Sequence, residues 1–266
     1  MRKVLAIVRA NWLTTLSYRL ETFFSFIGLF IAVVPLYFIS RALQPMMSSV
    51  IKSEAPEYFG FLMVGLLTFS FVQTAVNALH GSLGGEISTG SFEALLATPT
   101  SFVTLLAGMT GQAFSMTSIR ALVALLFATA FGAHVIWSSA PAALLVLVLI
   151  VLSYLPFGIM AASLVLAFRT TGPFPGGLLA VSGLLGGVYY PTQVVPSWLQ
   201  QVSVFVPLTY GLRALRRSLL DGAPLTSSAG DLLVLMAGSA VLFAVSIGMF
   251  AWALRYAKRM GTLAQY

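Results

Sequence analysis

The sequence predicts an all-α integral membrane protein with about six transmembrane helices. Of its 266 residues, 59% are hydrophobic and only 8% are charged, whereas soluble domains carry about 25% charged residues. Mean hydropathy is +0.96. The apolar runs are long and continuous, and one span needs ~20 apolar residues, so the chain has room for several helices and no sizeable soluble domain. The strands of a β-barrel would instead alternate weakly over ~10-residue segments.

The first 20 residues predict an amphipathic helix that lies in the membrane interface. Basic side chains, including Arg2 and Lys3, alternate with apolar ones, and Trp12 suits the level of the lipid headgroups. Arg9 interrupts the apolar run that a secretory signal would need, so we expect this helix to remain uncleaved. Basic clusters at both ends of the chain place both termini in the cytoplasm of a multi-pass protein of the cell membrane, plasma or inner.

Six apolar runs are predicted to span this membrane. Their boundaries are 22–40, 58–79, 103–133, 140–168, 174–190 and 232–254. The third run has a polar middle, which predicts either a tilted helix with one wet face or an interfacial turn followed by a span that starts near Phe114. The fifth run is short and rich in glycine, as suits close packing between helices in lipid.

A polar, helix-capable segment, residues 81–101, separates the second and third spans. Two glutamates seven residues apart would share one helix face, glycine and serine give a turn, and a proline ends the element. We interpret the segment as a docking element, with a solvated loop as the alternative. The residues that carry this interpretation are Glu86, Gly90, Phe92, Glu93, Leu96 and Pro99.

A second informative segment, residues 191–222, precedes the last span. Its prolines divide it into pieces too short to cross the bilayer, and its aromatic side chains suit an interface. We expect external re-entrant or interfacial helices here. The motif residues are Tyr190, Pro191, Pro196, Trp198 and Pro207.

Both segments resemble those of ABC-2 type permeases, the membrane subunits of ABC exporters. The first resembles their cytoplasmic coupling segment and the second their helices before the last span. The resemblance implies a translocation path for a lipid-like, drug-like or glycan cargo, a separate ABC ATPase subunit and a second permease, either a copy or a paralogue. The basic residue usual after the first glutamate is replaced by Ile87 and Ser88, which puts in doubt an ion pair with the ATPase at that position.

The sequence offers no catalytic or cofactor chemistry of its own. It contains no Gly-x-x-x-x-Gly-Lys-Ser/Thr, so we expect ATP hydrolysis on the partner chain only. There is no cysteine, and the two histidines are far apart, so no metal site is expected. Nucleic acid is not an expected partner. An ion-coupled secondary transporter and a membrane-embedded lipid enzyme remain as alternatives, although the seven acidic residues lie mostly in loops.

Four arginines are candidates for contact with the path or with lipid. Arg120 is inside an apolar run, where a central charge costs at least ~2.5 kcal/mol. It either lines a wet path or meets an anionic headgroup, or it is bound structurally by Gln112, Ser115 or helix carbonyls, which is the interpretation we favour. The others are predicted to form one basic helix edge that anchors lipid phosphate, outside the membrane and against the positive-inside tendency. They are Arg213, Arg216 and Arg217.

Overall fold

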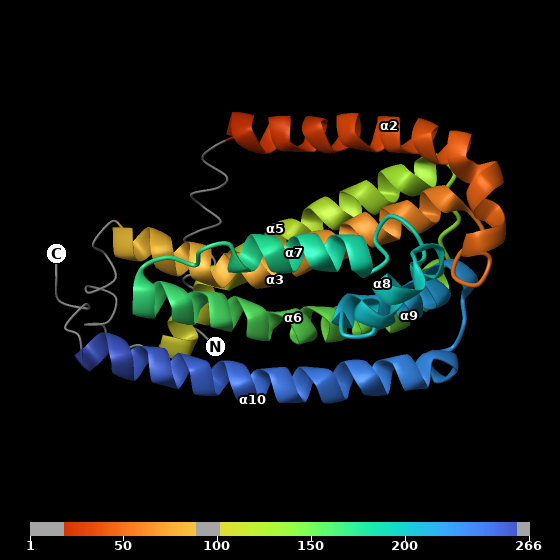
Figure 1. The fold of residues 1–266 in the computed structure, drawn as a ribbon. Helices are drawn as coiled ribbons and strands as arrows, with labels where there is room; N and C mark the ends of the chain where they lie inside the picture. The colour runs from red at the N-terminus through yellow and green to blue at the C-terminus, as the bar shows by residue number, and fades with distance from the viewer. Residues whose placement is uncertain (1–18, 89–101, 260–266) are drawn as a thin grey trace.

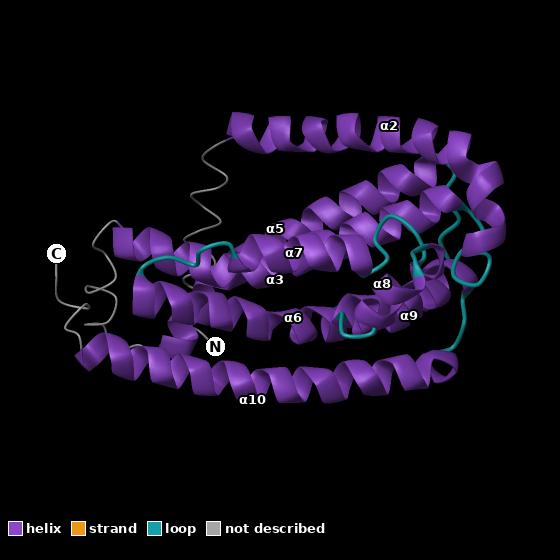
Figure 2. Ribbon diagram, viewed as in Figure 1, coloured by secondary structure: helices purple, strands orange, loops and turns teal. Residues whose placement is uncertain are grey.

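The computed structural model describes residues 19–88 and 102–259, and within these ranges every regular element is a helix (Figure 2). Five described helices are long and apolar enough to cross a membrane, and they run side by side along the long axis of the molecule (Figure 1). They are α2 (Arg19–Ile51), α3 (Tyr58–Ser88), α5 (Phe102–Ala130), α6 (Ala140–Phe168) and α10 (Ala229–Arg259). The predicted all-α membrane fold is confirmed.

The outer faces of these helices carry large apolar side chains. Phe38 of α2, Leu144 of α6 and Leu233 of α10 are each more than half exposed. Exposed apolar area on this scale is rare on a soluble monomer and matches the surface that a bilayer would cover.

The fifth predicted span, 174–190, is not one full-length helix. α7 (Phe174–Leu185) has 12 residues, which is ~18 Å at ~1.5 Å per residue, whereas the hydrocarbon core is ~30 Å thick. Gly187, at φ +81°, turns the chain after it. A side chain at Gly186 would press against Leu208, so only glycine fits there. α7 runs in the same direction as α2 and α5, towards the end where α3 begins (Figure 1).

The first helix is longer than the predicted span 22–40. α2 continues beyond residue 40 to Ile51, with Pro45 inside it, and its last turns bend towards the start of α3 (Figure 1). The Gln44 side-chain oxygen accepts a hydrogen bond of 2.7 Å from the backbone N–H of Tyr58. The end of α2 therefore supplies a partner for one free N–H at the start of α3.

Short helices gather at one end of the bundle, which we call the cap end (residues 51–58, 131–139 and 186–228). It contains η1 (Trp137–Ser139), η2 (Thr192–Val194), α8 (Ser197–Ser203), α9 (Pro207–Asp221) and η3 (Leu225–Ser228). At the opposite end, which we call the far end, α3 stops, α5 starts, the α6–α7 turn reverses the chain and α10 finishes (Figure 1).

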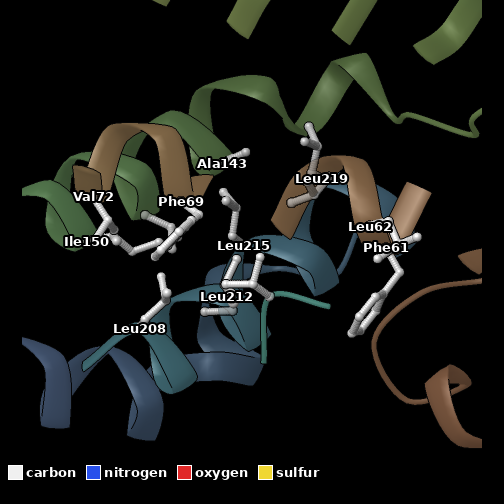
Figure 3. Packing of buried hydrophobic residues seen from close by; sticks show 14 of the residues in the cluster. Phe61, Leu62, Phe69, Val72, Ala143, Ile150, Leu208, Leu212, Leu215 and Leu219 are labelled. Carbon is white, nitrogen blue, oxygen red and sulfur yellow. The ribbon is translucent and has the colours of Figure 1, made fainter. Parts of the chain in front are cut away.

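The main core lies where α9 packs onto α3 and α6. α9 is amphipathic, with leucines at positions i, i+4, i+7 and i+11 on its buried face. In Figure 3, Leu208, Leu212 and Leu215 are the nearer ones to Phe69 and Val72 of α3 and Ile150 of α6, whereas Leu219 lies further along α9. The leucines are Leu208, Leu212, Leu215 and Leu219. α9 is thus fixed as part of the bundle, not as a detached surface helix.

Candidate functional site

Most of the predicted coupling residues, Gly90, Phe92, Glu93, Leu96 and Pro99, lie outside the described residues. Glu86 is in the last turns of α3, which continues beyond the predicted end of the span to Ser88. Ser88, where α3 ends, and Phe102, where α5 begins, both lie at the far end (Figure 1). The role of the segment between them as a docking element stays a prediction.

The prolines of the second predicted motif each stand at the start of a short helix. Pro191 precedes η2, Pro196 precedes α8, and Pro207 is the first residue of α9. This is the position where a missing N–H costs nothing. Trp198 on α8 is 64% exposed, whereas Tyr190 is only half-buried. Whether these helices re-enter the membrane stays a prediction.

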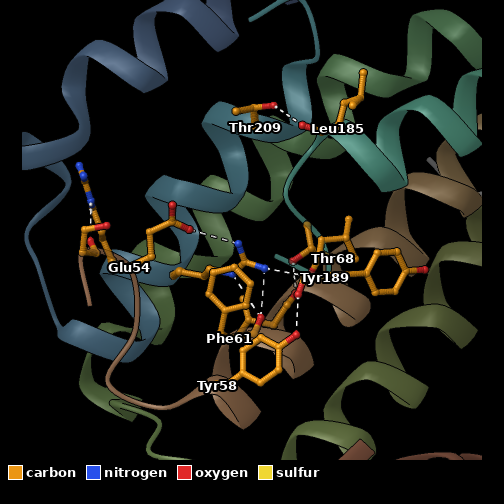
Figure 4. A network of polar contacts seen from close by, with 12 residues as sticks. Glu54, Tyr58, Phe61, Thr68, Leu185, Tyr189 and Thr209 are labelled. Atoms are coloured by element: carbon orange, nitrogen blue, oxygen red, sulfur yellow. Dashed lines mark hydrogen bonds and ion pairs between the residues drawn. The ribbon is translucent and has the colours of Figure 1, made fainter. Parts of the chain in front are cut away.

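The Arg216 side chain forms hydrogen bonds to several members of a buried polar network at the cap end. Glu54, Tyr58 and Phe61 of this network are labelled in Figure 4. Arg216 is 1% exposed, and its Nη1 donates to Glu54 Oε2 at 3.2 Å. Nε and Nη2 donate to the Phe61 carbonyl at 3.2 and 3.1 Å, and Nη2 also donates to the Val188 carbonyl at 3.1 Å. The guanidinium stacks 3.3 Å from the centroid of the Phe61 ring. The prediction of a lipid-phosphate anchor is therefore wrong for Arg216.

Burial sets the electrostatics of this network. It lowers the pKa of Arg216 to about 10, while the Glu54 carboxylate acts in the opposite direction. This pKa remains well above neutral pH, so the Arg216 guanidinium keeps its charge. The network is extended by Tyr58, whose hydroxyl donates to the Tyr189 carbonyl at 2.9 Å. It joins the α2–α3 turn, α3, the chain after α7 and α9 into one unit.

The other two arginines of the predicted basic edge behave differently. Arg213 is partly buried and forms an ion pair of 3.3 Å with Asp231 at the start of α10. Arg217 is half-buried, and its Nε donates to the Ser53 carbonyl at 3.4 Å. The three side chains thus point to three different neighbours, and the lipid-anchor prediction stays open only for Arg217.

A cleft of about 780 Å³ lies between α2, α3 and α5, which diverge towards the far end (Figure 1). The α2 wall is apolar. α3 and α5 contribute a polar side halfway along the bundle, where the hydroxyls of Thr74 and Thr117 share a hydrogen bond of 2.8 Å. The polar lining residues are Ser70, Gln73, Thr74, Asn77, Ser82, Thr117 and Arg120.

The polar side of the cleft follows a helical pattern. Ser70, Gln73, Thr74 and Asn77 occupy positions i, i+3, i+4 and i+7 of α3, so they share one face. Sequence reasoning missed this face, although polar side chains at helical spacing within a span are the signal that marks it. Along the other wall, α5 is a single continuous helix, with Thr117 and Arg120 one turn apart.

Arg120 is exposed towards this cleft. Among the described residues, its guanidinium has no hydrogen-bond or ion-pair partner. The Ser115 hydroxyl instead donates to the carbonyl of Gln112 at 2.8 Å. The structure thus shows no bond from Arg120 to Gln112, Ser115 or a helix carbonyl, and its role as a path residue stays a prediction.

A second hollow, of about 500 Å³, lies between α3, α5 and α6, but its lining is almost entirely apolar. Its two hydroxyls are occupied within their own helices, because Thr68 donates to the Val64 carbonyl and Ser118 to the Phe114 carbonyl. It offers a polar molecule no obvious partner, so the cleft beside Arg120 is the stronger candidate site. No group of three His, Asp or Glu side chains able to hold a metal occurs in the part of the chain that the structure describes.

The sequence matches the family model described as ABC-2 type transporter over residues 2–220. The chain belongs to the ABC-2 type transporter family. It is also similar to the linearmycin resistance permease protein LnrN of Bacillus subtilis (strain 168), with 28% identity over 108 residues. This stretch covers 40% of the present chain but only 28% of LnrN, so the chain spans well under half of that relative.

Family membership confirms the resemblance seen in the sequence and sets the general role of the molecule. An ABC-2 protein is a multi-pass membrane component of a transporter and is not itself an enzyme, and the family normally works with an ATPase subunit. In this ABC-2 protein, the cleft between α2, α3 and α5 carries a polar side within a mostly apolar lining.

Proposed function

We propose that this ABC-2 protein is the permease subunit of an ABC exporter and that the cleft forms part of its cargo path. The observation that carries the proposal is the polar side of the cleft, with Arg120, Gln73 and Asn77 at mid-depth of helices that otherwise are apolar. Polar and charged groups within membrane spans are costly and usually mark substrate pathways. A separate ATPase chain would supply the energy, since this sequence has no phosphate-cradling loop.

In this proposal the far end faces the cytoplasm, where the segment 81–101 meets the ATPase. Arg255 and Arg259, in the last turns of α10, also lie at this end, as the positive-inside tendency requires. Two of the three cap-end arginines that opposed this orientation are neutralised by acids of the same chain, Arg213 by Asp231 and Arg216 by Glu54. Closure of the ATPase on ATP would then move the coupling segment and the interfacial helix 1–20.

We further propose a second permease, a copy or a paralogue, against the outer face of α7. Val181 and Leu184 are about half exposed there. Gly176 and Gly177 face open space, because a side chain added at either would meet no atom within 4 Å. Such small residues allow another helix to approach closely in lipid. Because α7 is shorter than the bilayer, a partner at this face would also cover membrane-depth chain that α7 leaves irregular.

The cargo belongs to an amphipathic class, whether lipid-like, drug-like or glycan-linked. The α2 wall presents apolar side chains such as Leu29 and Val33 opposite the polar faces of α3 and α5. LnrN is a permease of linearmycin resistance, which favours a drug-like cargo among these three.

A mild-detergent pull-down of the tagged full-length chain tests the proposed function. We expect a nucleotide-binding subunit to co-purify in stoichiometric amount and the complex to hydrolyse ATP. A chain that purifies alone, in a membrane extract where the ATPase subunits of other exporters are captured, would support the ion-coupled carrier instead.

Glu93→Arg is expected to abolish or greatly weaken the association with the ATPase while the membrane fold survives, because it reverses a charge in the predicted docking segment. The measurement is the ratio of ATPase to permease after purification. Glu57→Arg is the matched control, since Glu57 is exposed at the cap end and the charge change is the same. Equal ATPase recovery in both variants would remove Glu93 from the docking surface.

A further inference from the structure

We propose that the cleft between α2, α3 and α5 binds the anionic headgroup of an amphipathic molecule, with Arg120 as its counter-ion and the α2 wall as the support for its apolar tail. The head is a carboxylate, phosphate or sulfate. The role of this molecule as exported cargo rests on the proposed function, whereas its binding does not.

The depth of Arg120 is the first step. It lies ten residues from either end of Thr110–Ala130, the part of α5 that is long and apolar enough to cross a membrane. Ten residues of helix extend ~15 Å, so Arg120 is far from both ends of this apolar stretch. A charge in the middle of an apolar span is costly unless another group compensates it.

The described side chains supply no compensating acid. No Asp or Glu is among the described residues that line the cleft, and the two ion pairs of this part of the chain, Arg213–Asp231 and Arg216–Glu54, lie at the cap end. The contrast with Arg216 is informative, because that guanidinium is fully enclosed by a carboxylate and two backbone carbonyls. Arg120 has the same fork of donors but holds it open towards the cleft.

The neighbours of Arg120 add donors in the same cleft. Gln73 and Asn77, four residues apart on α3, carry exposed side-chain amides. Thr117 is one turn from Arg120 on α5, and its hydrogen bond to Thr74 fixes α3 against α5 at this level. A guanidinium binds carboxylate or phosphate through two parallel hydrogen bonds, and amide N–H groups can complete the shell around the remaining oxygens.

The remaining lining selects for a tail. Leu29 and Leu36 of α2 and Leu66 of α3, all partly exposed, form an apolar surface beside the donors. A small inorganic anion would leave this surface in contact with water, whereas an acyl tail would cover it. The pairing of one cation with a long apolar wall thus favours an amphipathic anion over a simple ion.

The experiment uses the full-length chain in nanodiscs of zwitterionic phosphatidylcholine and a photoreactive 16-carbon carboxylate, with its methyl ester as the uncharged probe. We expect the carboxylate to label peptides of α2, α3 and α5. Arg120→Gln should reduce this labelling about tenfold or more, since a hydrogen bond to a charged group contributes about 1.5–3 kcal/mol. Arg120→Lys should keep most of it. Arg255→Gln, which removes an exposed cation from α10, should leave it unchanged.

Equal labelling by the carboxylate and the ester in the unmutated chain, or undiminished labelling in folded Arg120→Gln, would overturn the proposal. The comparison between the carboxylate and its ester uses the unmutated chain, so it still tests the proposal if Arg120→Gln misfolds. Competition by phosphatidylglycerol in the disc would identify a membrane lipid as the source, and competition by added dodecyl phosphate alone would identify a soluble amphiphile. If labelling depends on Arg120 but no ATPase co-purifies with the chain, the proposed export function is rejected and the binding site is kept. If the ATPase co-purifies but labelling does not depend on Arg120, only the binding site is rejected.

Discussion

Arg216→Met is expected to destabilise the folded protein by about 3–5 kcal/mol, the usual consequence of removing one partner of a buried ion pair. The Glu54 carboxylate, which is 4% exposed, would remain buried without its counter-charge. The carbonyls of Phe61 and Val188 would lose their donors as well. The measurement is the apparent melting temperature and the monodisperse yield in detergent, and we expect little folded protein at growth temperature.

Arg217→Met is the matched control, because Arg217 is the next residue of α9 but is only half-buried and donates to the Ser53 carbonyl alone. Its free energy of unfolding should lie within about 0.5 kcal/mol of that of the unmutated chain. Glu54→Gln should fall between the two, since its amide can still accept from Arg216 while the charge is lost. If Arg216→Met and Arg217→Met melt alike, the network does not stabilise the cap end.

The cap end shows what sequence reasoning could not reach. Composition and apolar runs were enough for the fold class, because a membrane imposes helices on any chain this apolar. The pair Glu54–Arg216, by contrast, joins residues 162 positions apart, and no local pattern links them. The spacing of Arg213, Arg216 and Arg217 identified a basic edge, but burial turned the middle arginine inwards against an acid from the α2–α3 turn.

The cleft was partly predictable for a different reason. An arginine inside an apolar run stands out in any sequence, and Arg120 was therefore singled out. Gln73 and Asn77 do not stand out in the sequence, because uncharged amides lower the hydropathy of a span only slightly. These groups share one cleft because particular faces of α3 and α5 meet. The Thr74–Thr117 hydrogen bond shows which faces these are, and no pattern in the sequence predicts this contact.

The length of α7 was also beyond sequence reasoning. An apolar run from 174 to 190 has enough residues to span, and only the turn at Gly187 shortens the helix. A glycine in an apolar run is equally compatible with close packing between two helices and with the end of a helix. Here Gly183 packs on the Phe69 ring, whereas Gly186 and Gly187 end the helix.

Gly158→Ala is expected to cost about 1–3 kcal/mol, the range for overpacking a tight contact. Gly158 of α6 lies so close to the Ala75 carbonyl of α3 that an added Cβ cannot fit without moving one of the two backbones. The obstacle is backbone, not a flexible side-chain end, so the strain cannot be relieved by a rotamer change. The apparent melting temperature in detergent measures the effect.

The matched control is Gly238→Ala in α10, where an added Cβ meets no atom within 4 Å. It should leave stability unchanged or raise it slightly, because alanine is the better helix former. The contact at Gly158 also bears on function, since α3 buries Val72 and Ala75 on one side and turns Gln73 and Asn77 to the cleft on the other. A shift of α3 should therefore lower carboxylate-probe labelling as well as stability. Equal melting of the two alanine variants would mean that α3 and α6 can separate freely, and that α3 is not held in place by this contact.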